Sequence, residues 1–72
     1  MFTTNERIKA YRQRMGLSQE EIAAKMGMTH PPYLAREKGR KSWTLAELEK
    51  LAEIFGCTVK NLIEDHADQT IK

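Results

Sequence analysis

The chain has 72 residues and one cysteine, so it is long enough for one small domain and cannot form an internal disulfide. It contains no run of about 18 or more apolar residues, and its charged first fifteen residues lack the apolar segment of a signal peptide. We therefore expect a cytoplasmic protein without a membrane span. With Cys57, His30 and His66 as its soft ligands, we expect neither a metal site nor a cofactor.

The charge is unevenly distributed along the chain, although the net charge is only +2. Residues 1–44 hold nine Lys and Arg against four acids, and so carry +5. Residues 45–72 hold three Lys against six acids, and so carry −3. A basic part of this kind suits a polyanion such as nucleic acid, the alternative being an ordinary scatter of surface charge.

Helix signals dominate, and they predict an all-α domain over residues 1–65 followed by a flexible tail at 66–72. The first helix opens at Thr3, which forms a capping box with Glu6, and Gly16 ends it. Its inward positions are Ile8, Tyr11 and Met15. The second helix opens with Ser18 and Glu21 and ends at Gly27. Its inward positions are Ile22, Ala23 and Met26.

The third helix reaches about Lys38, before Gly39, and its start is unusual because Pro31 and Pro32 follow one another. A residue before proline avoids helical dihedrals, and neither proline has an N–H that Thr29 could cap. We therefore expect this helix to begin at Pro31 or Pro32, with Thr29 and His30 in an extended turn.

The fourth helix opens with Thr44 and Glu47 and ends at Gly56. Its inward positions are Leu45, Leu48, Leu51, Ala52 and Phe55. Thr58 caps a short fifth helix, which contains Val59, Leu62 and Ile63. The acids Glu47, Glu49, Glu53 and Glu64 fit solvated helix faces.

The window from Gln19 to Lys38 fits a helix-turn-helix. Two steeply crossing helices need a small residue where they touch and a glycine where the chain reverses. Ala23 and Gly27 meet these two needs at a spacing of four residues. An ordinary pair of bundle helices is the alternative, but it matches this pattern less often.

Five runs of the sequence resemble the phage Cro and repressor family, which has an XRE-type helix-turn-helix. They are residues 16–23, 27–29, 37–40, 44–52 and 55–59. The resemblance covers roughly residues 5–65. It implies a compact five-helix fold like that of lambda repressor, and it implies DNA binding.

The resemblance also implies roles for individual residues. Gln19 would contact a phosphate, Thr29 and its successors would enter the major groove, and Arg12 would pair with Glu37 in a structural ion pair. The implied DNA-binding residues are Ser18, Gln19, Thr29, His30, Pro31, Leu34, Ala35, Lys38, Arg40, Lys41 and Ser42.

The recognition helix departs from the family pattern. Of His30, Pro31, Leu34 and Ala35, only His30 can hydrogen-bond a base edge, whereas Leu34 and Ala35 could contact thymine methyl groups. Either an unusual site is read partly by apolar contact and DNA shape, or this helix is adapted to a protein ligand. Arg36 stands where relatives carry an apolar residue, and the spacing leaves open whether Tyr33 or Leu34 points inward.

Family members of this size usually bind DNA as symmetric dimers, which implies a homodimer on an inverted repeat of double-stranded DNA. Candidate interface residues are Phe55, Cys57, Val59 and Leu62. No catalytic motif stands out, so we expect a transcriptional regulator, most simply a repressor, and not an enzyme. The alternative function is an antitoxin-like or partner-binding module whose main ligand is another protein.

Overall fold

The computed structural model describes residues 3–63, and within that range it is all-helical, without β-strands. Its helices are α1 (Thr4–Arg14), α2 (Gln19–Lys25), α3 (His30–Glu37) and α4 (Leu45–Phe55). A fifth helical segment spans residues 59–63. The predicted all-α, five-helix architecture is therefore confirmed, whereas the expected tail at 66–72 lies outside the described residues. In the described range no helix is both long and apolar enough to cross a membrane.

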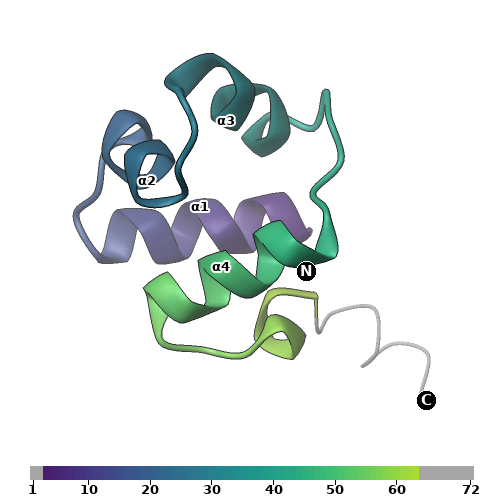
Figure 1. The fold of residues 1–72 in the computed structure, drawn as a ribbon. Coiled ribbons are helices and arrows are strands. Elements are labelled where there is room, and N and C mark those ends of the chain that lie inside the picture. The colour runs from purple at the N-terminus through teal and green to yellow at the C-terminus, as the bar shows by residue number, and fades with distance from the viewer. Residues whose placement is uncertain (1–2, 64–72) are drawn as a thin grey trace.

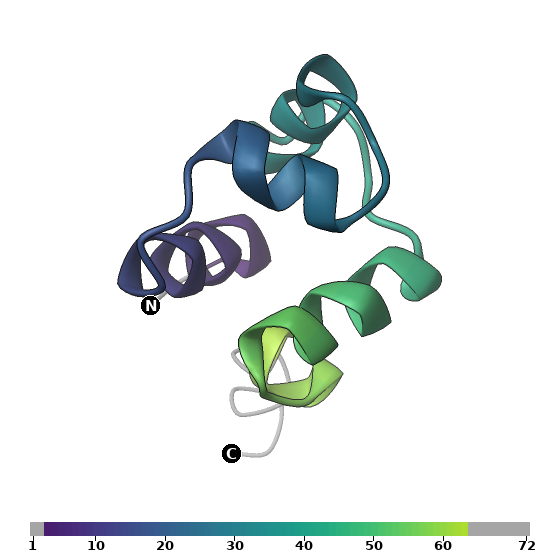
Figure 2. The same cartoon turned by 60° about the vertical axis from the view of Figure 1, so that its left-hand side comes forward.

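The helices form two layers around a small core. α1 and α4 lie side by side beneath the α2–α3 pair, and the fifth segment folds back under α4 (Figures 1 and 2). Fully or almost fully buried apolar side chains from all five helical segments form one core cluster. They are Ile8, Ile22, Ala23, Tyr33, Leu51, Ala52 and Leu62. Burial of each large member stabilises the fold by about 1.5–3 kcal/mol.

The predicted helix starts of α1, α2 and α4 carry reciprocal capping boxes. In each box a hydroxyl accepts from the backbone N–H three residues on, and the glutamate there accepts from the cap residue's own N–H. The pairs are Thr3 with Glu6, Ser18 with Glu21, and Thr44 with Glu47. Thr58 and Asn61 exchange equivalent bonds of 3.0 and 3.1 Å, so the fifth segment is capped as predicted.

The turn inside the helix-turn-helix depends on Gly27, whose φ of 78° is strained for any residue with a side chain. Its N–H donates to the Ala24 carbonyl at 3.0 Å, and the Met28 N–H donates to the Ala23 carbonyl at 2.9 Å. This paired arrangement satisfies carbonyls at the end of α2. The chain can therefore leave α2 sharply and return as α3.

Two apolar side chains expected to face inward are exposed. Met15 follows α1 and retains 47 % of its surface, and Leu45 opens α4 with 63 % exposed. Both stand at helix termini, where the helix projects past the core. Helical periodicity specifies the direction of a side chain but not whether a neighbour exists there.

The predicted late start of α3 is wrong. α3 is helical from His30, Thr29 is its N-cap, and the two prolines occupy its second and third positions. The first four N–H groups of a helix have no partner within it, so prolines there remove no helical hydrogen bond. The dihedral preference before proline is therefore overridden, since His30 bonds to α2 and Tyr33 is fully buried. The expected absence of a Thr29 side-chain cap is confirmed, and α3 has eight residues, close to the two turns expected.

Candidate nucleic-acid interface

Tyr33 lies on the buried inner face of α3. Its side chain is fully buried, whereas Leu34 is only half-buried, which resolves the choice that the sequence left open. The ring packs edge-on against Trp43, with 5.7 Å between ring centroids. Trp43 in turn donates its indole N–H to Asn5 Oδ1 at 2.7 Å. Trp43 thus links Tyr33 of α3 to Asn5 of α1.

A polar network, the Glu37 cluster, lies at the centre of the helix-turn-helix and consists of Arg12, Gln19, His30, Tyr33 and Glu37. Arg12 Nε donates to Glu37 Oε2 at 2.9 Å, with side-chain exposures of 9 % and 4 %. Tyr33 Oη donates to the same oxygen at 2.7 Å. Gln19 Nε2 donates to the other oxygen at 2.8 Å. The Arg12–Glu37 ion pair implied by the family resemblance is therefore present and almost entirely withdrawn from water.

Glu37 is charged because its partners outweigh its burial. Burial alone would raise the pKa of its carboxyl, but hydrogen bonds from Tyr33, Arg12 and Gln19 lower the pKa below the ordinary value. Burial and the hydrogen bond to this carboxylate raise the pKa of Tyr33, which therefore remains a hydrogen-bond donor. The cluster is thus an ionised carboxylate surrounded by donors.

The cluster extends to the outer surface through Gln19. Because its amide nitrogen donates to Glu37, its Oε1 is left to accept from His30 Nε2 at 3.0 Å. His30 Nδ1 lies 3.7 Å from the Glu20 carboxylate. Both ring nitrogens of His30 therefore face α2, and one N–H of the Gln19 amide has no role within the cluster.

The predicted DNA-binding residues come from three places: the start of α2, α3 with its N-cap, and the segment 38–42. The exposed ones are Ser18, Thr29, Pro31, Lys38, Arg40, Lys41 and Ser42. The half-buried ones are Gln19, His30, Leu34 and Ala35. Ser18 already serves as the N-cap of α2, where its hydroxyl accepts from Glu21.

The basic segment 38–42 is tied back to α3. The N–H groups of Arg40 and Lys41 both donate to the Ala35 carbonyl, at 2.8 and 3.3 Å. Gly39 N–H donates to the Arg36 carbonyl at 3.0 Å, which completes the same type of helix ending as at Gly27. The backbone that presents these cations is therefore fixed relative to α3.

An ion pair that joins α3 to α4 was not predicted from the sequence. Arg36 Nε donates to Glu47 Oε1 at 3.0 Å, and Arg36 Nη1 donates to the Pro32 carbonyl at 3.0 Å. Glu47 was expected on a solvated face, but its side chain is only 18 % exposed. Burial would raise the pKa of Glu47, but hydrogen bonds from the Thr44 N–H and Arg36 lower it. The capping box of Thr44 and Glu47 fixes this carboxylate, and it was the sequence feature that could have indicated where Glu47 lies.

The candidate dimer residues differ in how much surface they offer. Leu62 is fully buried and belongs to the core, so it is not available to a partner. Phe55, Cys57 and Val59 are half-buried against the core, and Phe55 stacks on Tyr11 with ring centroids 5.2 Å apart.

Comparisons with known proteins agree with this geometry. The sequence profile described as helix-turn-helix matches residues 8–62. The cryptic phage CTXphi transcriptional repressor RstR of Vibrio cholerae is 38 % identical over 61 residues, which cover 85 % of this chain and 55 % of that protein. This chain thus spans about half the length of that relative.

Two further relatives have closer lengths. The control protein C.MunI of a Mycoplasma species is 31 % identical over 61 residues, covering 85 % of this chain and 82 % of that protein. The crystal structure of the hypothetical transcription factor NHTF from Neisseria superposes with a TM-score of 0.77 at 28 % identity, over 83 % of this chain and 69 % of that one. The chain belongs to the helix-turn-helix family of the phage-repressor type, a family of DNA-binding transcription regulators.

Proposed function

We propose that the protein is a dimeric repressor that binds an inverted-repeat operator, with α3 of each subunit in the major groove. The observation that carries the proposal is the rigid basic segment 38–42 beside the partly exposed face of α3. Phosphate contacts from such a segment position the protein, and base-edge contacts from the adjacent helix supply sequence preference.

Each surface has its own task in this proposal. Lys38, Arg40, Lys41 and Ser42 contact the backbone after α3, and Ser18 and the remaining amide N–H of Gln19 contact it at the start of α2. The base-facing residues are Thr29, His30, Pro31, Leu34 and Ala35. Leu34 and Ala35 suit thymine methyl groups, while His30 must exchange a bond to α2 for one to a base.

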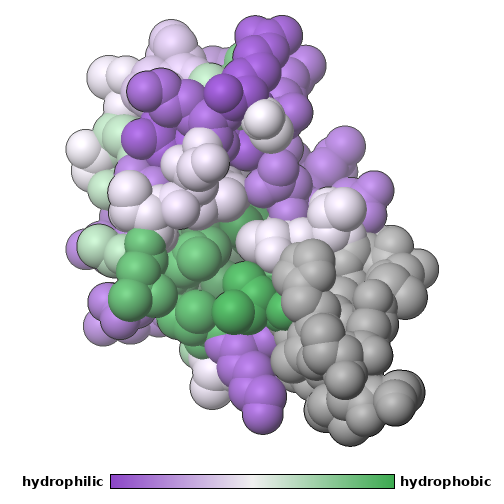
Figure 3. Space-filling model, turned by 90° about the vertical axis from the view of Figure 1, so that its right-hand side faces the viewer, coloured by the Kyte–Doolittle hydropathy of each residue, from purple (hydrophilic) through white to green (hydrophobic). Residues whose placement is uncertain are grey.

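The dimer surface in this proposal lies on the α4 side. Leu45 and Ile63 are exposed by 63 % and 38 %, and Phe55, Cys57 and Val59 are half-buried. Figure 3 shows a hydrophobic patch in the middle of this face, below a hydrophilic upper part. Exposed apolar patches of this kind are typical of interaction sites. Pairing through it would separate the half-sites by about 34 Å, one turn of DNA.

A salt titration tests DNA binding. We expect the affinity for a labelled mixed-sequence duplex, followed by anisotropy, to fall by orders of magnitude between about 50 and 200 mM salt. Lys41→Gln should weaken binding and flatten the salt dependence, whereas Lys60→Gln on the fifth segment should do neither. Salt-independent binding would contradict the proposal.

Light scattering tests the dimer. Leu45→Lys should shift the mass of the DNA-bound protein toward the monomer, because it places a charge in the proposed contact. Met15→Lys places the same charge on another exposed apolar side chain, at the end of α1, and should leave the mass unchanged. A monomeric wild type on DNA would refute the dimer.

A further inference from the structure

The surface beside the start of α1 carries two residues, Asn5 and Lys9, that have no role in the proposed function. A depression of about 460 Å³ opens there, between α1 and the segment that follows α3. We call it the α1 depression. Its lining residues are Asn5, Glu6, Lys9, Glu37, Lys38 and Arg40. It therefore shares Lys38 and Arg40 with the proposed backbone contacts.

The cations of the α1 depression are free to meet an anion. Lys9, Lys38 and Arg40 are exposed, and none forms an ion pair with an acid in residues 3–63. The two acids at its edge are occupied: Glu6 accepts from the Thr3 N–H at 2.9 Å, and Glu37 is neutralised by Arg12. An unoccupied positive surface of this kind attracts phosphate.

Asn5 adds an oriented neutral donor. The indole of Trp43 can only donate, so the atom facing it at 2.7 Å is Asn5 Oδ1. The amide Nδ2 is thereby turned toward Gly39, where a Cβ would stand 3.4 Å from it. No residue in the range 3–63 accepts a hydrogen bond from Asn5 Nδ2, so its N–H groups are available to a ligand.

We propose that the α1 depression binds a phosphate of the DNA backbone through Asn5, Lys9, Lys38 and Arg40. This inference rests on the proposed function, and it adds α1 to the surfaces that hold the duplex. Trp43 then acts as a positioning residue, because it determines that Asn5 presents a donor and not an acceptor.

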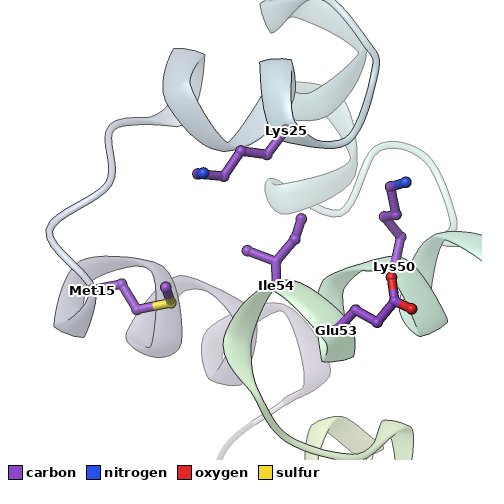
Figure 4. Close-up of a pocket in the computed structure, with 5 residues that line it drawn as sticks. All are labelled: Met15, Lys25, Lys50, Glu53 and Ile54. Carbon is purple, nitrogen blue, oxygen red and sulfur yellow. The ribbon is translucent and has the colours of Figure 1, made fainter.

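A second cleft offers a matched comparison. Met15, Lys25, Lys50, Glu53 and Ile54 line it, at the ends of α1 and α2 and along α4. Figure 4 shows Lys25 and Lys50 on opposite sides of Ile54, with Glu53 beside Lys50. This cleft shares no residue with the proposed DNA contacts. Loss of a lysine here removes the same charge at a place where no phosphate is expected.

The test compares Lys9→Gln with Lys25→Gln, each as the full chain, on a labelled mixed-sequence duplex over a series of salt concentrations. For Lys9→Gln the slope of log affinity against log salt should flatten by about 0.9 per lost contact. The ratio of wild-type to variant affinity then changes about threefold per contact between about 50 and 200 mM salt. Lys25→Gln should keep the wild-type slope, and circular dichroism verifies the fold of both variants.

A neutral variant separates the donor from the charge. Asn5→Ala should lower the affinity severalfold while leaving the salt slope unchanged, because no cation is lost. Salt-dependent binding by the wild type, with equal slopes for Lys9→Gln and Lys25→Gln, would overturn this site and leave the proposed function intact. Failure of the wild type to bind any duplex would refute both.

Discussion

The interior of the domain has two parts of different character, one polar and one apolar. One is the Glu37 cluster beneath α3, where an ion pair and two further donors meet a single carboxylate. The other is the apolar contact of α1 and α4 with the fifth segment, built around Ile8, Leu51 and Leu62. Apolar contacts have no direction and tolerate small shifts, whereas the cluster requires particular atoms at particular distances. The helix that we propose to face DNA is thus held by the more directional of the two.

The largest expected effect is on the polar side. Arg12→Ala or Glu37→Ala should each lower the free energy of unfolding by roughly 3–5 kcal/mol, because each leaves a buried charge without its partner. Urea titration followed by circular dichroism measures this loss. Wild-type stability in either variant would show that the cluster contributes nothing specific.

On the apolar side, Leu51→Ala should cost about 2–5 kcal/mol, since it leaves a cavity in a fully buried position. Glu49→Ala is the matched control on the same helix, and its exposed side chain should change stability by no more than about 0.5 kcal/mol. Equal losses in the two variants would contradict the core position of Leu51.

The stability that the polar and the apolar part of the interior contribute should also depend differently on pH. The pKa of Glu37 is lowered in the folded state, so its charge adds stability above the ordinary carboxyl pKa of 4.5. That contribution is lost as the pH falls below this value toward the folded pKa. Glu37→Gln should be less stable than the wild type at neutral pH and show a weaker loss of stability on acidification. Parallel stability–pH curves would contradict the assigned ionisation.

The smallest effects concern the helix starts. Thr44→Ala removes a hydroxyl that caps α4 and should cost about 1 kcal/mol. Thr29→Ala should cost much less, because the Thr29 side chain makes no capping bond at α3. A Thr29 variant as unstable as the Thr44 variant would reveal a cap that the structure lacks.

Sequence reasoning was most successful where a local rule determines the structure. Three capping boxes and the glycine at position 27 gave the helix boundaries, because both depend on residues within one turn of each other. Periodicity wrongly predicted that Met15 and Leu45 face the core, because it carries no information about where the core ends.

Polar contacts between residues far apart in the sequence could not be predicted from such local rules. Gln19 meets Glu37 across 18 positions and Arg36 meets Glu47 across 11, and no spacing in the sequence predicts either contact. The Arg12–Glu37 pair was available only through the family resemblance. At α3 the dihedral preference before proline was overridden by tertiary contacts of His30 and Tyr33, which a local rule cannot include.

In the proposed complex α3 supplies sequence preference, while the segment 38–42 supplies affinity. Selection of binding sites from random duplexes, with the wild type, His30→Ala and Lys41→Gln, tests it most directly. The wild type should enrich an inverted repeat with half-sites one turn apart, and Lys41→Gln should enrich the same repeat with weaker binding. His30→Ala should enrich a different sequence while its affinity for mixed-sequence duplex stays near that of the wild type. An identical motif for His30→Ala and the wild type, or no motif for any of the three, would contradict the account.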